Sequence, residues 1–272
     1  MIHKHRYGLL RSHPDKTKRA HKFSLVHGAR IPATLPEFTS NACYNSPVRD
    51  QGTTGCCTGE AHVAALEYLA IKAGDLPTPL SPLFVYSIAR ILEGTLSQDA
   101  GAEPADVIQA LTTEGVCRES MWPLDPDMVS VIPPTGCYTE AAGHKVTASQ
   151  VLESLDDMKA CLAMGLGFTF GIECFPSMET DEVNESGDIP MPGMWERISG
   201  QSLGGHDLFA FDFDDRIGMF LLKNSWGKLW GRNGFGRIPY AYLQNPRLAY
   251  DFHCIQADES YTFANGNPAG SV

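Results

Sequence analysis

One segment, residues 57–73, constrains the fold more than any other, because its sequence CTGEAHVAALEYLAIKA is apolar on nearly every face of a helix. A helix of this kind is stable in water only where protein surrounds it on almost all sides. The pattern therefore predicts a helix at the centre of a lobe, ending at Gly74. The 272 residues of the chain suffice for one large domain or for two lobes around a cleft.

The order of patterns along the chain predicts an α+β architecture. Up to about residue 145 the chain is helix-rich, with Pro79–Pro82 as the expected start of the helix LFVYSIARILEG, and with the helix EPADVIQALTTEG. A further helix, LESLDDMKACLAMG, precedes four strand-like segments, FTFGIECF, HDLFAFDFD, GMFLLKNSW and GFGRIPYAYL. A helical lobe over about 50–145 and an antiparallel, barrel-like β lobe over about 146–256 would leave a cleft between them.

Three other stretches are predicted to lie outside these lobes or on their surface. Residues 1–35 read as an extended basic arm, interrupted by prolines and without a helical or strand period. Residues 176–200 are long, acidic and rich in Pro and Gly, which is typical of a surface loop near a functional site. Residues 257–272 read as a flexible tail.

Charge is distributed unevenly along the chain. The formal net charge of -11 argues against a protein that binds nucleic acid by neutralising phosphates. Residues 1–30, however, carry a net charge of +7 and five of the nine histidines, which leaves -18 for the other 242 residues. A basic arm attached to an acidic body makes that body a candidate binding partner for the arm.

The cysteines form no recognisable metal or redox motif. The chain has eight cysteines without a CxxC pair and without zinc-like Cys/His spacing, so we expect neither a metal nor a cofactor. Most are expected to be buried free thiols, and a disulfide among Cys43, Cys117 and Cys137 stays open. The pairing state of the others is equally open from sequence: Cys161, Cys174 and Cys254.

No segment of the sequence predicts contact with a membrane. The chain has no run of about 18 apolar residues, as a membrane-spanning helix requires. The first 20 residues lack the apolar core of about 7–15 residues that a secretory signal peptide contains. The expected location is therefore cytoplasmic, or outside the cell by another export route.

A glycine-rich turn that leads directly into the central helix is the richest chemical signal. In PVRDQGTTGCCTGEAHVAALEYL, Cys57 stands at the expected helix N-terminus, where aligned N–H groups stabilise a thiolate. Gln51, six residues upstream, can direct its amide toward the same point as one donor of an oxyanion hole. The alternative is an ordinary turn with two structural cysteines and a surface glutamine.

A thiolate nucleophile needs a base, and His206 is the best-placed candidate. It follows a Gly-Gly turn and enters the apolar strand DLFAFDF, whereas His62 lies on a helix face turned away from Cys57 and is expected to be core or surface. Asn224, in KNSWGKLWGRNGFGRI, ends a strand and can orient the imidazole, with Trp226 and Trp230 excluding water. A purely structural role for these residues stays open at this point. The remaining histidines outside the arm are His144 and His253.

Together these segments resemble the papain-like cysteine peptidases, in particular their compact bacterial and viral members. The segments PVRDQGTTGCCTGEA, GGHDLFAF and KNSWGKLWGRNGFGRI occur in the family's order, and 149 residues separate Cys57 from His206. The resemblance covers about residues 36–256. It implies the two-lobed papain-like fold and a polypeptide substrate.

The resemblance also implies a role for each matching residue. Cys57 and His206 would form a thiolate–imidazolium pair that Asn224 orients, and Gln51 with the backbone N–H of Cys57 would form the oxyanion hole. Catalysis would proceed through a thioester. The positions implied to bind substrate are Gly101 and Ala102, in place of the family's Gly-Gly pair, together with Gly205 and Trp226.

Four further positions depart from the family pattern. Thr54 and Asp99 stand where the family has two disulfide-bonded cysteines, so the resemblance implies that this bridge is absent. Thr58 replaces the tryptophan of papain. Cys56, directly before Cys57, is expected to fill a slot for a small residue, with a redox pair as the alternative.

Two questions stay open from the sequence alone. The basic arm, residues 1–35, is either an autoinhibitory strap lying in the cleft or a flexible segment that docks elsewhere. The chain itself is either a peptidase, a catalytically silent binding protein, or an acyl transferase on the same fold.

Overall fold

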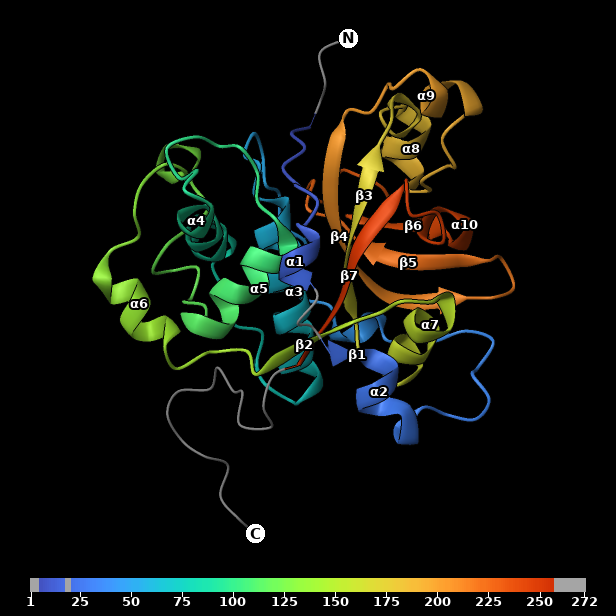
Figure 1. Cartoon of the computed structure of the whole chain (residues 1–272), viewed down its shortest axis with the longest axis horizontal. Helices are drawn as coiled ribbons and strands as arrows, with labels where there is room; N and C mark the ends of the chain where they lie inside the picture. Colours follow the sequence, from blue (N-terminus) through green and yellow to red (C-terminus); the bar gives the residue numbers. More distant parts are fainter. Residues whose placement is uncertain (1–4, 18–20, 257–272) are drawn as a thin grey trace.

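The structure, a computed structural model, describes residues 5–17 and 21–256 and consists of two lobes side by side (Figure 1). The helical lobe contains four helices: α3 (Cys57–Lys72), α4 (Pro82–Glu93), α5 (Pro104–Thr113) and α6 (Thr135–Ala141). The other lobe is built on a sheet with strand order β1-β2-β7-β3-β4-β5-β6. All neighbouring strands are antiparallel except the pair β1 and β2.

The strands of this sheet differ greatly in length, and β4 is the longest. Their bounds are β1 (His21–Lys22), β2 (Ala148–Val151), β3 (Phe168–Cys174), β4 (Gly204–Asp214), β5 (Met219–Lys223), β6 (Phe235–Pro239) and β7 (Ala249–Gln256). Nine consecutive residues of β4 are buried. Protein therefore covers both faces of this strand, with Phe209 and Phe211 in the core of the helical lobe and Phe213 in the core of the β lobe.

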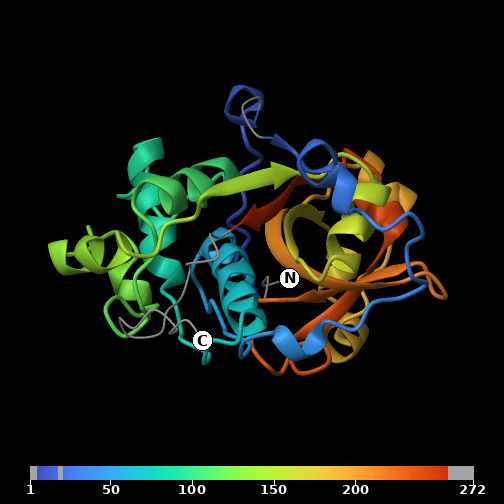
Figure 2. The ribbon, with the colours of Figure 1, turned by 90° about the horizontal axis from the view of Figure 1, so that it is seen from below.

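Helix α3 lies in the middle of the molecule, as its apolar sequence predicts. Thirteen of its 16 residues are buried. It packs against α4 and α5 on one side and against β3, β4 and β7 on the other, and Figure 2 shows it between the other helices and the sheet. This burial fixes the N-terminus of α3 at the boundary between the lobes.

Several other predicted elements are confirmed together with their caps. The Ser81 side chain accepts the Phe84 N–H at the start of α4, and Gly94 ends that helix in the left-handed conformation. Helix α7 (Leu155–Ala163) is present, with the Ser154 side chain accepting the Asp157 N–H. Strands β3 and β5 lie within the segments that the alternation indicates, and β4 begins two residues before its segment, at Gly204, where a turn was expected.

The sequence analysis did not predict β2, β7 or α6, and three of the stretches that it did describe differ from the prediction. The first 35 residues are not extended throughout, since they form α1 (Pro14–Thr17), β1, α2 (Phe23–His27) and a 3₁₀ turn, η1 (Gly28–Arg30). Phe23 is fully buried in the core of the β lobe, so tertiary packing stabilises a helix that has no periodic pattern of its own. Pro14 begins α1 instead of interrupting it, because a first-turn N–H needs no helical partner.

The other two differences concern residues 176–200 and the end of the last predicted strand. Residues 176–200 contain η4 (Pro176–Met178), α8 (Asp181–Ser186) and α9 (Met194–Ile198), and Met178 and Val183 anchor the segment in the core. Strand β6 ends at Pro239, which has no N–H, and the chain continues as α10 (Tyr240–Leu243). The predicted flexible tail, 257–272, lies outside the described residues.

All eight cysteines lie within the described residues and are free thiols, seven of them buried and Cys43 exposed. Over residues 5–17 and 21–256, no helix combines the length and the apolar character needed to cross a bilayer.

Candidate active site

Cys57 occupies the first position of α3 and is completely buried. The turn before it is held against the β lobe, because the Gln51 N–H donates to the Ser225 carbonyl at 2.8 Å. Backbone N–H groups of Asp207, Gly8 and Thr58 act as donors toward the Cys57 sulfur. The nucleophile candidate is therefore surrounded by groups from α3, from β4 and from the N-terminal arm.

His206 and Asn224 are in direct contact, as the sequence analysis expects of an orienting pair. The Nε2 atom of His206, on β4, lies 2.8 Å from Oδ1 of Asn224, which follows β5. The same Oδ1 atom accepts the Ser225 N–H at 2.8 Å, so it acts as an acceptor and Nε2 carries a proton. The Nδ1 atom, which has no hydrogen-bond partner among the described residues, is left as the basic nitrogen.

Two tryptophans enclose this pair. Trp226 stacks on the His206 ring with centroids 4.5 Å apart, and Trp230 meets Trp226 edge-on at 5.7 Å. Both indoles are buried, which excludes water from the bond between His206 and Asn224.

The side chain of Gln51 is fixed at both ends of its amide. Its Oε1 atom accepts the Ser225 hydroxyl at 2.6 Å, and its Nε2 atom donates to the Thr54 carbonyl at 2.8 Å. The second contact of Nε2 is the carbonyl oxygen of Arg6, at 3.2 Å. An amide held in this way can donate to a carbonyl oxygen placed beside Cys57.

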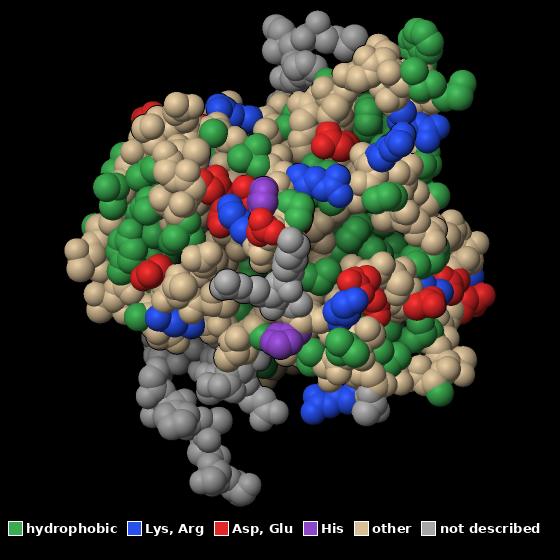
Figure 3. Space-filling model, in the orientation of Figure 1, with side chains coloured by type: hydrophobic (Ala, Val, Ile, Leu, Met, Phe, Trp, Pro, Cys, Tyr) green, Lys and Arg blue, Asp and Glu red, His purple; other side chains and the backbone are tan. Residues whose placement is uncertain are grey.

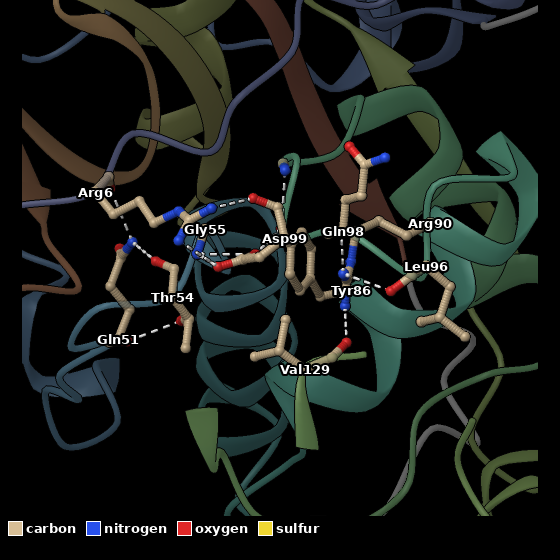
Figure 4. A network of polar contacts seen from close by, with 11 residues as sticks. Arg6, Gln51, Thr54, Gly55, Tyr86, Arg90, Leu96, Gln98, Asp99 and Val129 are labelled. Atoms are coloured by element: carbon tan, nitrogen blue, oxygen red, sulfur yellow. Dashed lines mark hydrogen bonds and ion pairs between the residues drawn. The ribbon is translucent and has the colours of Figure 1, made fainter. Parts of the chain in front are cut away.

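Asp99 joins the two segments that a disulfide would join in the family, as Figure 4 shows. Its carboxylate accepts the Gly55 N–H at 3.0 Å and the Tyr86 hydroxyl at 2.6 Å, and it pairs with Arg6 at 3.3 Å. Buried Arg90 supports the same loop by donating to the Gln98 carbonyl at 2.8 Å and to the Val129 carbonyl. Hydrogen bonds therefore connect the turn before Cys57 to the rim of the helical lobe.

The N-terminal arm passes between the lobes and covers this site (Figure 1). The Leu9 N–H donates to the Gly205 carbonyl at 2.9 Å, the Leu10 N–H donates to the Ala102 carbonyl at 3.0 Å, and the Ala102 N–H donates to the Gly8 carbonyl at 2.9 Å. Leu9 pairs in parallel with Ala102 and antiparallel with Gly205. The arm thus bridges the two lobes as one short extended strand.

Side chains of the arm fill the remaining space around the nucleophile. Leu9 is 4% exposed and forms a small buried cluster with Cys57 and Tyr250. The His5 ring lies flat on Trp226 with centroids 4.0 Å apart. A Cβ atom on Gly101 would come within 2.3 Å of the Gly8 carbonyl oxygen. The arm therefore contacts every residue that the sequence analysis expects to bind substrate: Gly101, Ala102, Gly205 and Trp226.

Ion pairs fix the rest of the arm to the acidic body. Lys16 lies 2.6 Å from Asp106 and 3.0 Å from Glu103, and Lys22 lies 2.8 Å from Glu153. Figure 3 shows basic and acidic side chains next to one another across the middle of this face. Lys22 and Glu153 are both exposed, so their pair contributes about 1 kcal/mol or less, whereas Asp106, the partner of Lys16, is buried.

Burial under the arm shifts both ionisable groups of the pair away from their charged forms. Desolvation raises the pKa of the Cys57 thiol to about 12, although the backbone N–H donors around the sulfur oppose this. Desolvation also lowers the pKa of His206 to about 4, against the opposing effect of Asn224. With the arm in place, both groups are therefore uncharged at neutral pH.

Comparisons with known proteins agree with this geometry. No protein-family model matches the chain. A C1-like peptidase of Acanthamoeba polyphaga mimivirus, described as uncharacterized, is 34% identical over 233 residues, which cover 82% of this chain and 71% of the viral protein. The chain belongs to the papain-like (C1) cysteine peptidases.

Solved structures show the same fold. Xylellain, a cysteine protease from Xylella fastidiosa, superposes with a TM-score of 0.81 at 30% identity, covering 93% of this chain and 96% of xylellain. A Carica candamarcensis cysteine protease in complex with E-64 has a TM-score of 0.62 at 19% identity, covering 82% of this chain and all of that one. The papain-like α+β fold expected from the sequence is confirmed.

Sequence reasoning missed several residues around the nucleophile. Asp207 could have been singled out from the sequence, because a carboxylate is unusual inside the apolar strand segment that begins at His206. Gly8 and Leu9 belong to the only apolar run in the first 20 residues, which also indicates burial. Tyr250 gave no such signal, since only the sheet register brings β7 next to Cys57.

We predict that Cys57 of the full-length chain reacts slowly with iodoacetamide at pH 7, and that its rate rises with pH without a plateau near neutrality. A thiol with a pKa of about 12 is almost entirely protonated at pH 7. Peptide mapping of the alkylated protein measures the rate, and exposed Cys43 in the same sample serves as the control. A rate at Cys57 above that of Cys43 at pH 6 would contradict this assignment.

Proposed function

We propose that the chain is a cysteine peptidase that hydrolyses peptide bonds, with Cys57 as nucleophile and His206 as base. The observation that most supports this is the bond of His206 to Asn224, which leaves Nδ1 as the basic nitrogen. Asp207 directly follows His206, and its backbone N–H donates toward the Cys57 sulfur. This contact links Cys57 on one lobe to the strand that carries His206 on the other. Membership of the papain-like family supports the same conclusion.

The proposed reaction follows from these positions. When the arm leaves and substrate enters, Cys57 transfers its proton to Nδ1 of His206, and the thiolate attacks the peptide carbonyl carbon. The oxyanion is stabilised by Gln51 Nε2 and by the N–H of Cys57. His206 then protonates the leaving amine, and a water molecule deprotonated by His206 hydrolyses the thioester.

We predict that Cys57→Ala abolishes hydrolysis of a fluorogenic peptide, whereas Cys56→Ala retains it. Cys56 is equally buried and directly adjacent, so it is the matched control. Once the arm is displaced, an epoxide thiol probe should add one mass equivalent to the chain that has Cys57 and none to Cys57→Ala. Activity that survives Cys57→Ala and disappears in Cys56→Ala would contradict the assignment.

The same probe separates the alternatives. A silent binding protein would remain unlabelled even after the arm is displaced. An acyl transferase would be labelled but would give transfer products when an acceptor amine is present, which product analysis by mass spectrometry distinguishes from hydrolysis.

We further propose that the arm inhibits the enzyme by occupying the substrate groove. The arm forms backbone hydrogen bonds, through residues 8–10, to the same groups of Ala102 and Gly205 that a substrate would need. The Arg6 carbonyl lies at the Gln51 amide, where an oxyanion would form. The arm and a substrate therefore compete for the same hydrogen bonds.

Gly8 is the point at which the arm fits most tightly. A Cβ atom at this position would lie 1.9 Å from the Gly55 carbonyl oxygen, in the turn that precedes Cys57. Backbone atoms cannot move aside as a flexible side chain can. A single methyl group at residue 8 therefore forces the arm away from the nucleophile and leaves the body unchanged.

We predict that Gly8→Ala in the full-length chain raises kcat/KM toward a small peptide about 10- to 100-fold, which corresponds to about 1–3 kcal/mol of overpacking. Gly28→Ala is the matched control, because a Cβ atom there meets nothing within 4 Å. Steady-state kinetics on the two variants and the wild type measure the effect. Equal kcat/KM in all three proteins would rule out inhibition by the arm.

A further inference from the structure

Behind the nucleophile lies a buried polar cluster that the proposed reaction does not use. His62 on α3, Thr169 on β3, Asp207 on β4 and His253 on β7 are each 2% exposed or less. Burying a polar group at this depth costs folding free energy unless the group is hydrogen-bonded. The contacts within this cluster are therefore worth following one by one.

The ring of His62 connects the first turn of α3 with β4. Its Nδ1 atom lies 2.8 Å from the Thr58 carbonyl oxygen and 3.3 Å from Oδ2 of Asp207. Because a carbonyl oxygen only accepts, Nδ1 must carry the proton. The other ring nitrogen, Nε2, lies 3.4 Å from the Thr169 hydroxyl.

Asp207 depends on this contact. Its Oδ1 atom accepts the Leu208 N–H at 3.1 Å, while Oδ2 lies 3.3 Å from Nδ1 of His62, whose proton is shared with the Thr58 carbonyl oxygen. Burial raises the pKa of Asp207, and the hydrogen bond and charge of His62 lower it again. The His62 ring is therefore the side chain that stabilises this buried carboxylate.

The other charged groups near Asp207 are already paired or carry the same charge. Arg49 and Lys223 line a small cavity together with Asp207, but Arg49 pairs with Glu67 and Lys223 donates to Ser46 at 2.7 Å. The remaining neighbours are acidic or neutral: Glu60 in the same cavity, Asp251 and His253 on β7, and the Cys57 thiol.

We propose that His62 and Asp207 form an internal brace that sets the position of Cys57 relative to His206. Thr58 directly follows Cys57, and Asp207 directly follows His206, so the ring of His62 links the residues next to both reacting groups. The proposal rests on the peptidase function proposed above, and it makes His62 and Asp207 positioning residues.

The effect of such a brace is large because catalysis depends on the placement of the reacting atoms. Cys57 belongs to a helix of one lobe and His206 to a strand of the other, so their separation depends on how α3 seats against β4. A misplacement of about 1 Å reduces the rate of an enzyme about 100-fold. Loss of the brace should therefore lower kcat and leave KM nearly unchanged, because neither side chain lies in the groove.

Three variants in the full-length Gly8→Ala background test the brace. His62→Phe keeps a ring but removes the donor, and His62→Asn retains an N–H close to the position of Nδ1. His253→Phe is the matched control, since it replaces a buried histidine of the same cluster whose ring nitrogens have no hydrogen-bond partner among the described residues. Thermal unfolding of each variant identifies the temperature range in which all are folded.

We expect His62→Phe to lower kcat at least 10-fold with KM within twofold, His62→Asn to recover part of that loss, and His253→Phe to retain the parent kcat. Equal kcat in His62→Phe and His253→Phe, or no recovery in His62→Asn, overturns the brace.

Failure of the peptidase function itself is distinguishable, because the parent Gly8→Ala protein would then neither hydrolyse peptide nor take up the epoxide probe.

Discussion

The burial of α3 is the constraint on which the rest of the structure depends. A helix that is apolar on nearly all sides has to be enclosed by helices on one side and by the sheet on the other. That enclosure places its N-terminus inside the protein, at the boundary of the lobes, where the backbone N–H groups of Thr58, Asp207 and Gly8 donate toward the Cys57 sulfur. The environment of Cys57 is thus a consequence of how the core is packed.

The same packing exposes polar backbone edges that need partners. Ala102 on one lobe and Gly205 on the other present carbonyl and N–H groups toward the cleft, and residues 8–10 of the arm satisfy them. Because the arm is basic and the body acidic, the arm is attracted to the groove before these specific hydrogen bonds form. The basic charge of the arm and its place over the candidate site therefore belong to the same interaction, the binding of the arm to the body.

Most of the fold and the residues that meet at the candidate site were predictable from local patterns: the apolar sequence of α3, the cap of α4, and the turn before Cys57. The Gly-Gly turn expected before His206 was wrong, because Gly204 and Gly205 pair with β3 as the first residues of β4. The arm's short helices were not predictable, since Phe23 is stabilised only by packing on the β lobe. Nor were the contacts of His62, which was expected to be core or surface. Its partners, Thr58 and Asp207, come together only when α3 seats on β4.

Hydrogen exchange of the Leu9 and Leu10 amides is the most direct test of the claim that the arm occupies the groove. In the unmodified chain both N–H groups are bonded to carbonyls of the body, so they should exchange slowly. After Cys57 is capped with an epoxide probe that fills the groove, the same amides should exchange at the rate of an unstructured peptide. Rapid exchange in the unmodified chain would contradict the account.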